Sequence, residues 1–238
     1  MPTLANILAI FRREIRSYFN SPVAYVVIVV FLAIIGWFFT SNLFLMNVAS
    51  LRVVFELVPL VLLFFVPAIT MRLLAEEKKS GTLELLTTKP VRDAEIILGK
   101  FLAAWALLAA ALIPTLLYVL TLTFLGSPDL GPVVTGYLGL LFMGAVYIGI
   151  GLFASSITEN QIVAFIISFL IILALFLMDK VLMYVPEGIA SVVEFLGIDY
   201  HFGNIARGVI DSRNVIYFLS LLGFSLYGAT VSLERRKW

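Results

Sequence analysis

Long apolar stretches separated by short polar intervals constrain this chain more than any other feature of its sequence. Of its 238 residues, 62% are hydrophobic and 13% are charged, whereas soluble domains are about half apolar and about a quarter charged. A helix needs about 20 largely apolar residues to cross the hydrocarbon core of a bilayer. The sequence therefore predicts an all-α integral membrane protein, built as a single transmembrane domain over residues 1–238.

The lengths of the apolar stretches predict six transmembrane helices. Pro59 and Pro67 in the second span and Pro114 in the third predict kinks, which neighbouring helices can accommodate by bonding the freed carbonyls. Small residues four positions apart are a weak sign of close helix packing; they are Ala106 with Ala110, Ala145 with Gly149, and Ser225 with Ala229. The expected spans are 23–44, 53–74, 96–125, 132–154, 162–178 and 215–231.

Two segments outside the spans are predicted to be amphipathic. Residues 1–21 carry apolar side chains at three- and four-residue steps beside Arg12, Arg13 and Arg16, which is typical of a helix lying in the headgroup region. Residues 179–213 contain several glycines and charges, so we expect an extracytoplasmic segment of two short helices on or in the outer leaflet. This broken helical segment precedes the last span.

The distribution of basic residues predicts the orientation. With the N-terminus inside, twelve Lys and Arg fall on the inner side and four on the outer side, which satisfies the positive-inside rule. Six spans return the C-terminus to the same side, so both termini are expected to be cytoplasmic. The inner residues are Arg12, Arg13, Arg16, Arg72, Lys78, Lys79, Lys89, Arg92, Lys100, Arg235, Arg236 and Lys237; the outer ones are Arg52, Lys180, Arg207 and Arg213.

Catalytic and metal-binding motifs are missing from the sequence. There is no G-x-x-x-x-G-K-[ST], H-E-x-x-H or G-x-S-x-G pattern, and no cysteine. The single histidine, His201, has no second His or Cys to share a metal and reads as a surface or packed residue. The net charge of +1 argues against nucleic acid as a partner. Carboxylates at the middle of the spans, which a proton-coupled carrier requires, are also missing. We therefore expect no catalytic, cofactor or metal site in this chain.

Residues 72–95 form the one strongly polar interval near the middle of the chain. Gly81 follows two lysines and a serine and is typical of a helix end. A short helix is expected from Thr82 to Thr88, bounded by Pro90 and carrying leucines beside Glu84. Asp93 is the expected N-cap of the third span, with Glu95 in its first turn. A charged loop is ordinary in a membrane protein, but a short helix with an apolar edge suggests a protein-binding surface.

This region resembles a known family. The sequence FVPAITMRLLAEEKKSGTLELLTTKPVRDAEIILGKFLA is similar to the first cytoplasmic loop of ABC-2 type ABC transporter permeases. The similarity is greatest to the gliding-motility-associated permease subunits, and it covers essentially the whole chain. The A-E-E-K-x-x-G-T-x-E-x-L pattern is fairly specific for the superfamily and much less specific for the substrate.

The resemblance implies a division of labour between subunits. Residues 76–89 would be a cytoplasmic coupling segment whose helix docks on a separate ABC ATPase, with two ATPases and a second permease copy or paralogue in the working unit. ATP and Mg²⁺ would be bound by the ATPase, and this permease would perform export or mechanical work across the bacterial inner membrane, among membrane lipids. The residues implied to contact the ATPase are Glu76, Glu77, Lys78, Gly81, Thr82, Glu84 and Leu85.

Two other functions stay open at this point. A transporter or channel driven by an ion gradient would work without an ATPase. A membrane scaffold that only anchors partners would need the loop but not the interior of its spans. Apolar and aromatic side chains along a pathway would suit a lipid, a glycolipid or another amphipathic solute, but composition alone does not identify the substrate.

Overall fold

All secondary structure in the described part of the chain is helical, which confirms the all-α prediction. The computed structural model describes residues 3–45, 50–82, 91–126, 129–181 and 187–235. The helices are α1 (Leu4–Asn20), α2 (Pro22–Leu45), α3 (Arg52–Thr70), α4 (Arg72–Lys79), α6 (Asp93–Leu112), the 3₁₀ turn η1 (Ile113–Thr115), α7 (Leu116–Leu125), α8 (Leu130–Ile157), α9 (Gln161–Leu177), α10 (Glu187–Leu196), α11 (Ile198–Ala206) and α12 (Ser212–Glu234).

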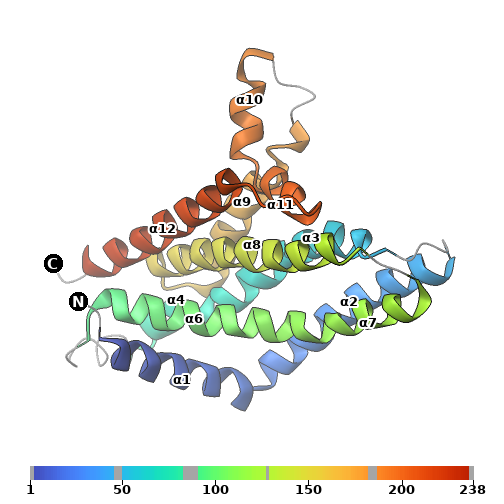
Figure 1. Ribbon diagram of the computed structural model, residues 1–238. Coiled ribbons are helices and arrows are strands. Elements are labelled where there is room, and N and C mark those ends of the chain that lie inside the picture. The colour runs from blue at the N-terminus through green and yellow to red at the C-terminus, as the bar shows by residue number, and fades with distance from the viewer. Residues whose placement is uncertain (1–2, 46–49, 83–90, 127–128, 182–186, 236–238) are drawn as a thin grey trace.

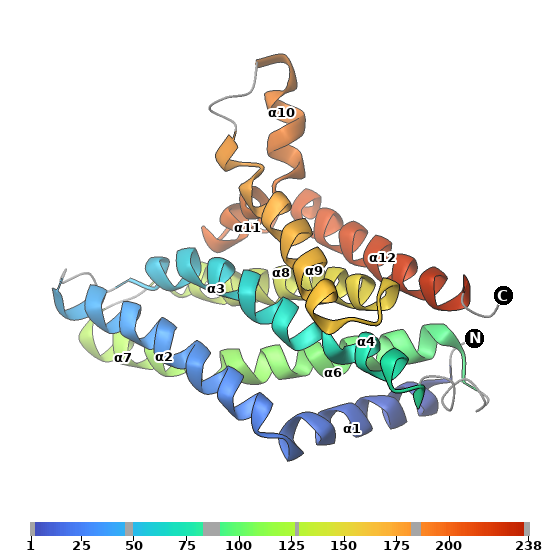
Figure 2. The ribbon, with the colours of Figure 1, turned by 180° about the vertical axis from the view of Figure 1, so that it is seen from behind.

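The long helices form a bundle around α8. Both views show the start of α1, the start of α6 and the end of α12 at the same end of the molecule (Figures 1 and 2). Helix α10 projects away from the other helices in both views. Helix α8 contacts α3, α6, α9, α11 and α12, so it is the axis on which the bundle is assembled.

Five helical stretches of the described residues are long and apolar enough to cross a membrane. They are Pro22–Phe44, Arg52–Lys79, Asp93–Leu125, Leu130–Ile157 and Ser212–Glu234. The predicted span 162–178 corresponds to α9, which is apolar but has only 17 residues. The chain is therefore a multi-pass membrane protein, with five helices that meet the length of a span and one shorter apolar helix.

Of the three prolines predicted to kink spans, Pro114 interrupts its helix. It lies in η1, which separates α6 from α7, because proline lacks the N–H that the helical ladder needs. Pro59 and Pro67 lie inside α3, which continues past both of them to Thr70. The second span is interrupted instead at Met71, between α3 and α4.

Glycines on α8 allow neighbouring helices to approach closely. A Cβ atom added at Gly151 would lie 2.0 Å from Thr70 Oγ1 and 2.7 Å from Thr70 Cβ, and one at Gly136 would lie 2.5 Å from the ring of Phe55. At Gly149, one of the small residues expected to pack closely, an added Cβ would lie 3.2 Å from Cβ of Ser225 on α12. Small residues of α8 thus set the separation from both α3 and α12.

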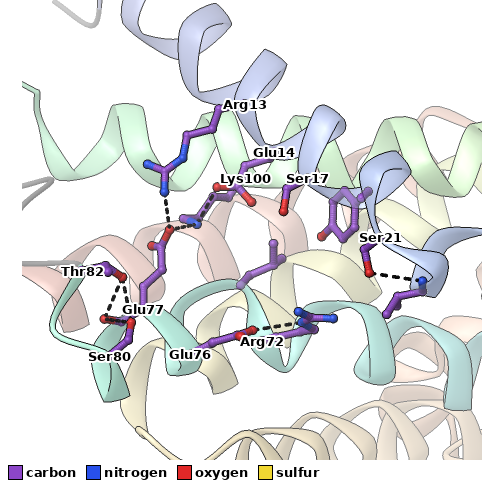
Figure 3. A pocket seen from close by; sticks show the side chains of 13 residues that line it. Arg13, Glu14, Ser17, Ser21, Arg72, Glu76, Glu77, Ser80, Thr82 and Lys100 are labelled. Carbon is purple, nitrogen blue, oxygen red and sulfur yellow. Dashed lines mark hydrogen bonds and ion pairs between the residues drawn. The ribbon is translucent and has the colours of Figure 1, made fainter.

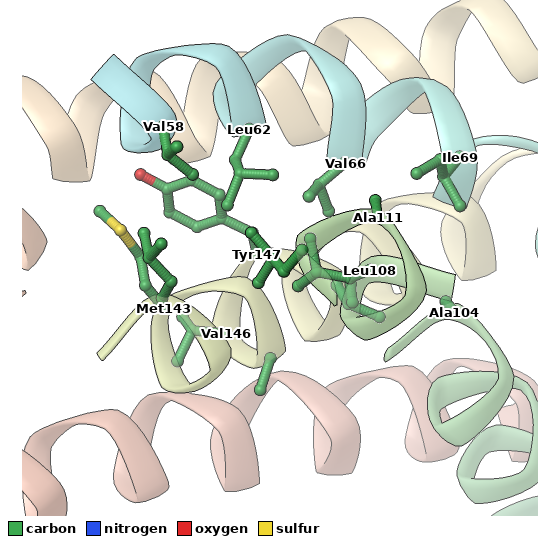
Figure 4. Packing of buried hydrophobic residues seen from close by; sticks show 14 of the residues in the cluster. Val58, Leu62, Val66, Ile69, Ala104, Leu108, Ala111, Met143, Val146 and Tyr147 are labelled. Carbon is green, nitrogen blue, oxygen red and sulfur yellow. The ribbon is translucent and has the colours of Figure 1, made fainter. Parts of the chain in front are cut away.

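A fully buried tyrosine fills the space between α8 and its neighbours. Tyr147 of α8 has no exposed surface, and its ring lies beside Val58 and Leu62 of α3, with Leu108 of α6 nearby (Figure 4). Helix α8 thus carries both a large ring, which fills the space beside α3 and α6, and glycines, which let side chains of neighbouring helices pack against its backbone.

His201 is a packed structural residue. Its ring is buried and stacks on Tyr217 with 3.9 Å between ring centroids. His201 Nε2 donates to the carbonyl of Phe195 at 2.8 Å, and the Tyr217 hydroxyl donates to the carbonyl of Leu196 at 2.6 Å. These carbonyls are at the C-terminus of α10, where the helix itself supplies no donors. The two side chains therefore attach the base of the projecting helix to α11 and α12.

A cationic side chain joins α11 to the segment after α9. Lys180 Nζ lies 2.8 Å from Asp179 and 2.7 Å from Asp199 of α11. Burial acts to lower the pKa of Lys180, but its hydrogen bonds to the two carboxylates outweigh burial and raise the pKa above its usual value. Lys180 is therefore charged at neutral pH and pairs with both aspartates.

Helix α1 divides its apolar residues between the protein and its surroundings. Ile7 is buried and Ile10 packs against the core, and both lie against Gly99 of α6. Leu4 and Leu8 are exposed, which leaves them free to contact lipid. The amphipathic pattern thus includes a contact with α6, and the interfacial position stays a prediction.

The contact between α8 and α3 makes a testable prediction about glycine. Gly151→Ala should lower the apparent melting temperature of the purified protein in detergent, because overpacking costs roughly 1–3 kcal/mol. Gly223→Ala is the matched control: no atom lies within 4 Å of a Cβ added there, so the greater helix propensity of alanine should leave stability equal or higher. Equal melting temperatures for the two variants would contradict this close contact.

Candidate functional site

Helix α4 is hydrogen-bonded at its N-terminal end to a serine of α8. Ser155 Oγ accepts hydrogen bonds from the N–H groups of Leu74 and Ala75, each at 3.0 Å, and donates to the carbonyl of Met71 at 3.0 Å. The hydroxyl is thus inserted into the backbone ladder where α3 ends and α4 begins, a recognised cause of helix kinks. Ser155 is fully buried, so this interruption of the second span is part of the packed core.

A buried ion-pair cluster connects α4 to α1 and α6. Lys100 Nζ of α6 lies 3.0 Å from Glu14 Oε1 of α1 and 2.9 Å from Glu77 Oε1 of α4 (Figure 3). The Lys100 side chain is 1% exposed, and the two glutamates are 14% and 13% exposed. Arg13 adds a weaker contact with Glu77 at 3.9 Å. The cluster, defined as Arg13, Glu14, Glu77 and Lys100, is where three helices far apart in sequence meet.

The ion-pair cluster borders a pocket of about 250 Å³ between α1, α4 and α6. Three basic and three acidic side chains line this pocket. Tyr18 also lines it, and burial raises the pKa of its phenol far above the usual value, with a further rise from Glu14 opposed by Arg72. The tyrosine is therefore neutral, and the balanced charges form a structural network. Among the described residues no group of three or more His, Cys, Asp or Glu is arranged to hold a metal.

Another face of α4 is attached to α8. Lys78 is buried, and its Nζ donates to the carbonyl of Ser156 on α8. Ser232 of α12 donates to the same carbonyl at 3.0 Å. Glu77 and Lys78 are adjacent in sequence but bond to different neighbours of α4. The end of this helix is therefore bonded to three others, α1, α6 and α8, and α12 bonds the same carbonyl of α8.

Helix α4 ends as the glycine predicts. Gly81 has a φ of +70°, a left-handed conformation that glycine adopts without strain. The N–H of Ser80 bonds the Glu76 carbonyl at 3.0 Å, and that of Gly81 bonds the Lys78 carbonyl at 3.2 Å. The Thr82 hydroxyl lies 2.8 Å from that of Ser80. The chain thus leaves α4 through an ordered turn.

The start of α6 differs from the prediction by one residue. The N-cap is Arg92, not Asp93, which is the first residue of the helix. Glu95 lies in the first turn as predicted, and its carboxylate accepts from the Arg92 N–H at 3.1 Å. It also accepts from the Thr3 N–H at 2.7 Å and the Asn6 side chain at 2.8 Å. The bond from Glu95 to the Arg92 N–H thus caps the start of α6, and the bonds from Thr3 and Asn6 join the beginning of α1 to α6.

The structure separates the residues implied to contact an ATPase into two groups. Glu76 is exposed and pairs with Arg72 of its own helix at 3.0 Å, and Gly81 and Thr82 are exposed at the end of α4. The side chains of Glu77 and Lys78 are directed into the bundle. Glu84 and Leu85, with the expected helix from Thr82 to Thr88, lie outside the described residues after Thr82.

Lys100 is the residue of this cluster that the sequence interpretation missed. It was counted only as a positive charge of the inner side, although it stands within the predicted span 96–125. A lysine eight residues into an apolar helix is costly unless it is paired, and this was the available signal. The identity of its partners was not readable, because Glu14 and Glu77 lie on other helices.

The similarity to known proteins agrees with this architecture. Residues 46–196 match the model of the ABC-2 family transporter proteins, and this match covers more than half of the chain. A search of curated proteins finds no match. The chain belongs to the ABC-2 family and is a membrane permease component of an ABC transporter.

The buried lysine makes a second testable prediction. Lys100→Met should destabilise the purified protein strongly, because removing one partner of a buried ion pair typically costs about 3–5 kcal/mol. The triple variant Glu14→Gln, Glu77→Gln, Lys100→Met should recover much of the lost melting temperature, since it removes the uncompensated charges. Lys79→Met, at an exposed position at the end of α4, is the matched control. A Lys100→Met protein as stable as the Lys79→Met protein would show that the pairs do not hold the helices.

Proposed function

We propose that this chain couples ATP hydrolysis by a separate ABC ATPase to export or mechanical work across the bacterial inner membrane. The observation that carries the proposal is the attachment of α4 on both of its sides. The rest of the polar interval 72–95 continues from the end of α4, and that end is bonded through Glu77 and Lys78 to α1, α6 and α8. A displacement of the segment would therefore act on most of the bundle at once.

The coupling residues would then have two roles. Glu76, Gly81, Thr82, Glu84 and Leu85 would form the surface that contacts the ATPase, as the family resemblance implies. Glu77 and Lys78 would transmit the movement, because their side chains already have partners inside the permease. ATP and Mg²⁺ would be bound by the ATPase and not by this chain.

The proposed membrane topology has six spans. Helix α9 would be the sixth: 17 residues correspond to about 25 Å of helix, near the lower limit for a crossing. An even number of spans agrees with the start of α1 and the end of α12 lying at the same end of the molecule (Figure 1). The positive-inside rule makes that end cytoplasmic. Helices α10 and α11 would then lie on the outer side, with the short α9 leading toward them.

The working unit would contain two permeases and two ATPases. The second permease would be another copy of this chain or a paralogue, and the assembly would belong to the gliding-motility-associated subgroup that the sequence resembles. Such an assembly could perform either export of an amphipathic solute or mechanical transduction.

Recovery of the ATPase tests the coupling segment. Deletion of residues 81–86, or Glu84→Arg, should leave membrane insertion intact and abolish co-purification of the cognate ATPase with the tagged permease. Glu56→Arg is the matched control, because Glu56 is an exposed glutamate on α3 that the proposal places at the opposite membrane face. Undiminished recovery of the ATPase with the deletion variant would refute the coupling assignment.

Single cysteines test the topology, since the natural chain has none. Ser80→Cys and Ser212→Cys replace exposed serines at the end of α4 and the start of α12. In intact cells an impermeant maleimide should label only position 212, and after permeabilisation it should label both. Labelling of both positions in intact cells would contradict the six-span topology.

A further inference from the structure

A second cavity lies between α8 and α12, on the side of α4 away from the ion-pair cluster. Its volume is about 550 Å³, and it opens at the surface as a groove. The two helices lie side by side at this end of the bundle in both views (Figures 1 and 2). The residues that line the groove are Lys78, Phe153, Ser156, Ile157, Phe224, Tyr227, Gly228, Val231, Ser232 and Arg235.

The walls of the groove along the two helices are apolar and aromatic. Phe224 is 78% exposed and Tyr227 is 70% exposed, so both large side chains face away from the protein core. Gly228 adds no side chain between them and Val231, and the ring of Phe153 lies 3.1 Å from where its Cβ would be. These walls present a slot of hydrocarbon character that faces outward from the bundle.

The end of the groove is polar and basic. Lys78 and Arg235 both line it, with the hydroxyl-bearing Ser232 between α8 and α12. Arg235 is exposed and follows the last residue of α12, and the sequence continues with Arg236 and Lys237. No acidic side chain is among the described residues that line the groove. The positive charge therefore gathers where the spanning helices end, at the level of lipid headgroups.

We propose that this groove binds an anionic phospholipid from the leaflet at this end of the bundle. The phosphate-bearing headgroup would lie at Arg235 and Ser232, beside Lys78, and an acyl chain would lie along Phe224, Tyr227 and Val231. A ligand with a long apolar part and a negative head matches both halves of the groove. A neutral lipid satisfies only the apolar half, and a soluble phosphate satisfies only the basic end.

The bound lipid would contact α4 through Lys78, directly beside the cluster that joins α4 to α1 and α6. Binding itself does not require an ATPase. Lipid retention therefore tests this proposal independently of the proposed function.

Native mass spectrometry of the purified full chain tests the site. The protein is mixed with phosphatidylglycerol or phosphatidylcholine of identical acyl chains, and inorganic phosphate is added in a third sample. Phosphatidylglycerol should be retained in preference to phosphatidylcholine, and phosphate should neither bind nor displace it. Arg235→Gln should lower phosphatidylglycerol retention by roughly fivefold, the loss typical of one basic residue near an anionic membrane surface. Val231→Trp should fill the slot and reduce retention of both lipids.

The same helix supplies matched controls at its other end. Arg213→Gln and Ile216→Trp alter exposed positions near the start of α12 and should leave retention unchanged. Equal retention of the two lipids by the natural chain would overturn the proposal. So would losses with Arg213→Gln and Ile216→Trp as large as those with Arg235→Gln and Val231→Trp. Because the Val231→Trp result does not depend on Arg235, the test stands even where one variant fails to insert.

Discussion

The buried amine of Lys100 is the constraint around which this end of the molecule is arranged. A lysine with 1% of its side chain exposed is stable only with its charge compensated, and Glu14 and Glu77 provide that compensation from two other helices. The requirement brings α1, α4 and α6 to one point. It also directs Glu77 inward, so that the next residue, Lys78, faces α8 and α12. One desolvated charge thus determines how the helix before the polar segment is held.

Helix α8 stabilises the bundle in a different way, by letting α3 and α12 pack closely against it without charged groups. Gly136 and Gly151 accept side chains of α3, and Gly149 accepts α12. In a membrane, helix association depends on van der Waals contact and interhelical hydrogen bonds, since lipid tails are as apolar as leucine. Ser155 provides such a bond at the break between α3 and α4. Packing at α8 and ion pairing at Lys100 therefore act on the same short helix from its two sides.

Part of the candidate site could be predicted from the sequence, and part could not. Gly81 as the end of a helix follows from local backbone preference, and the structure has it with a φ of +70°. The cap of α6 was misplaced by one residue, because the Glu95 carboxylate accepts from the backbone N–H of Arg92 while also binding the start of α1. The separation of Glu76, which is exposed, from Glu77 and Lys78, which are directed inward, depends on partners 20 to 80 positions away and leaves no local signature. The same holds for His201, because its acceptor at the base of α10, the Phe195 carbonyl, is brought to it by the packing of α10 and α11.

The sequence by itself determined that the chain is helical, crosses a membrane several times and carries one polar segment near its middle. Those properties follow from the length of apolar stretches and from local signals such as Gly81 and Pro114, which act within a few residues. Only the tertiary structure decided which charges are paired, where the second span is interrupted and which helices α4 contacts. Ion pairs, serine insertion and glycine contacts join residues far apart in the chain, and their energy depends on burial that exists only once the helices have assembled.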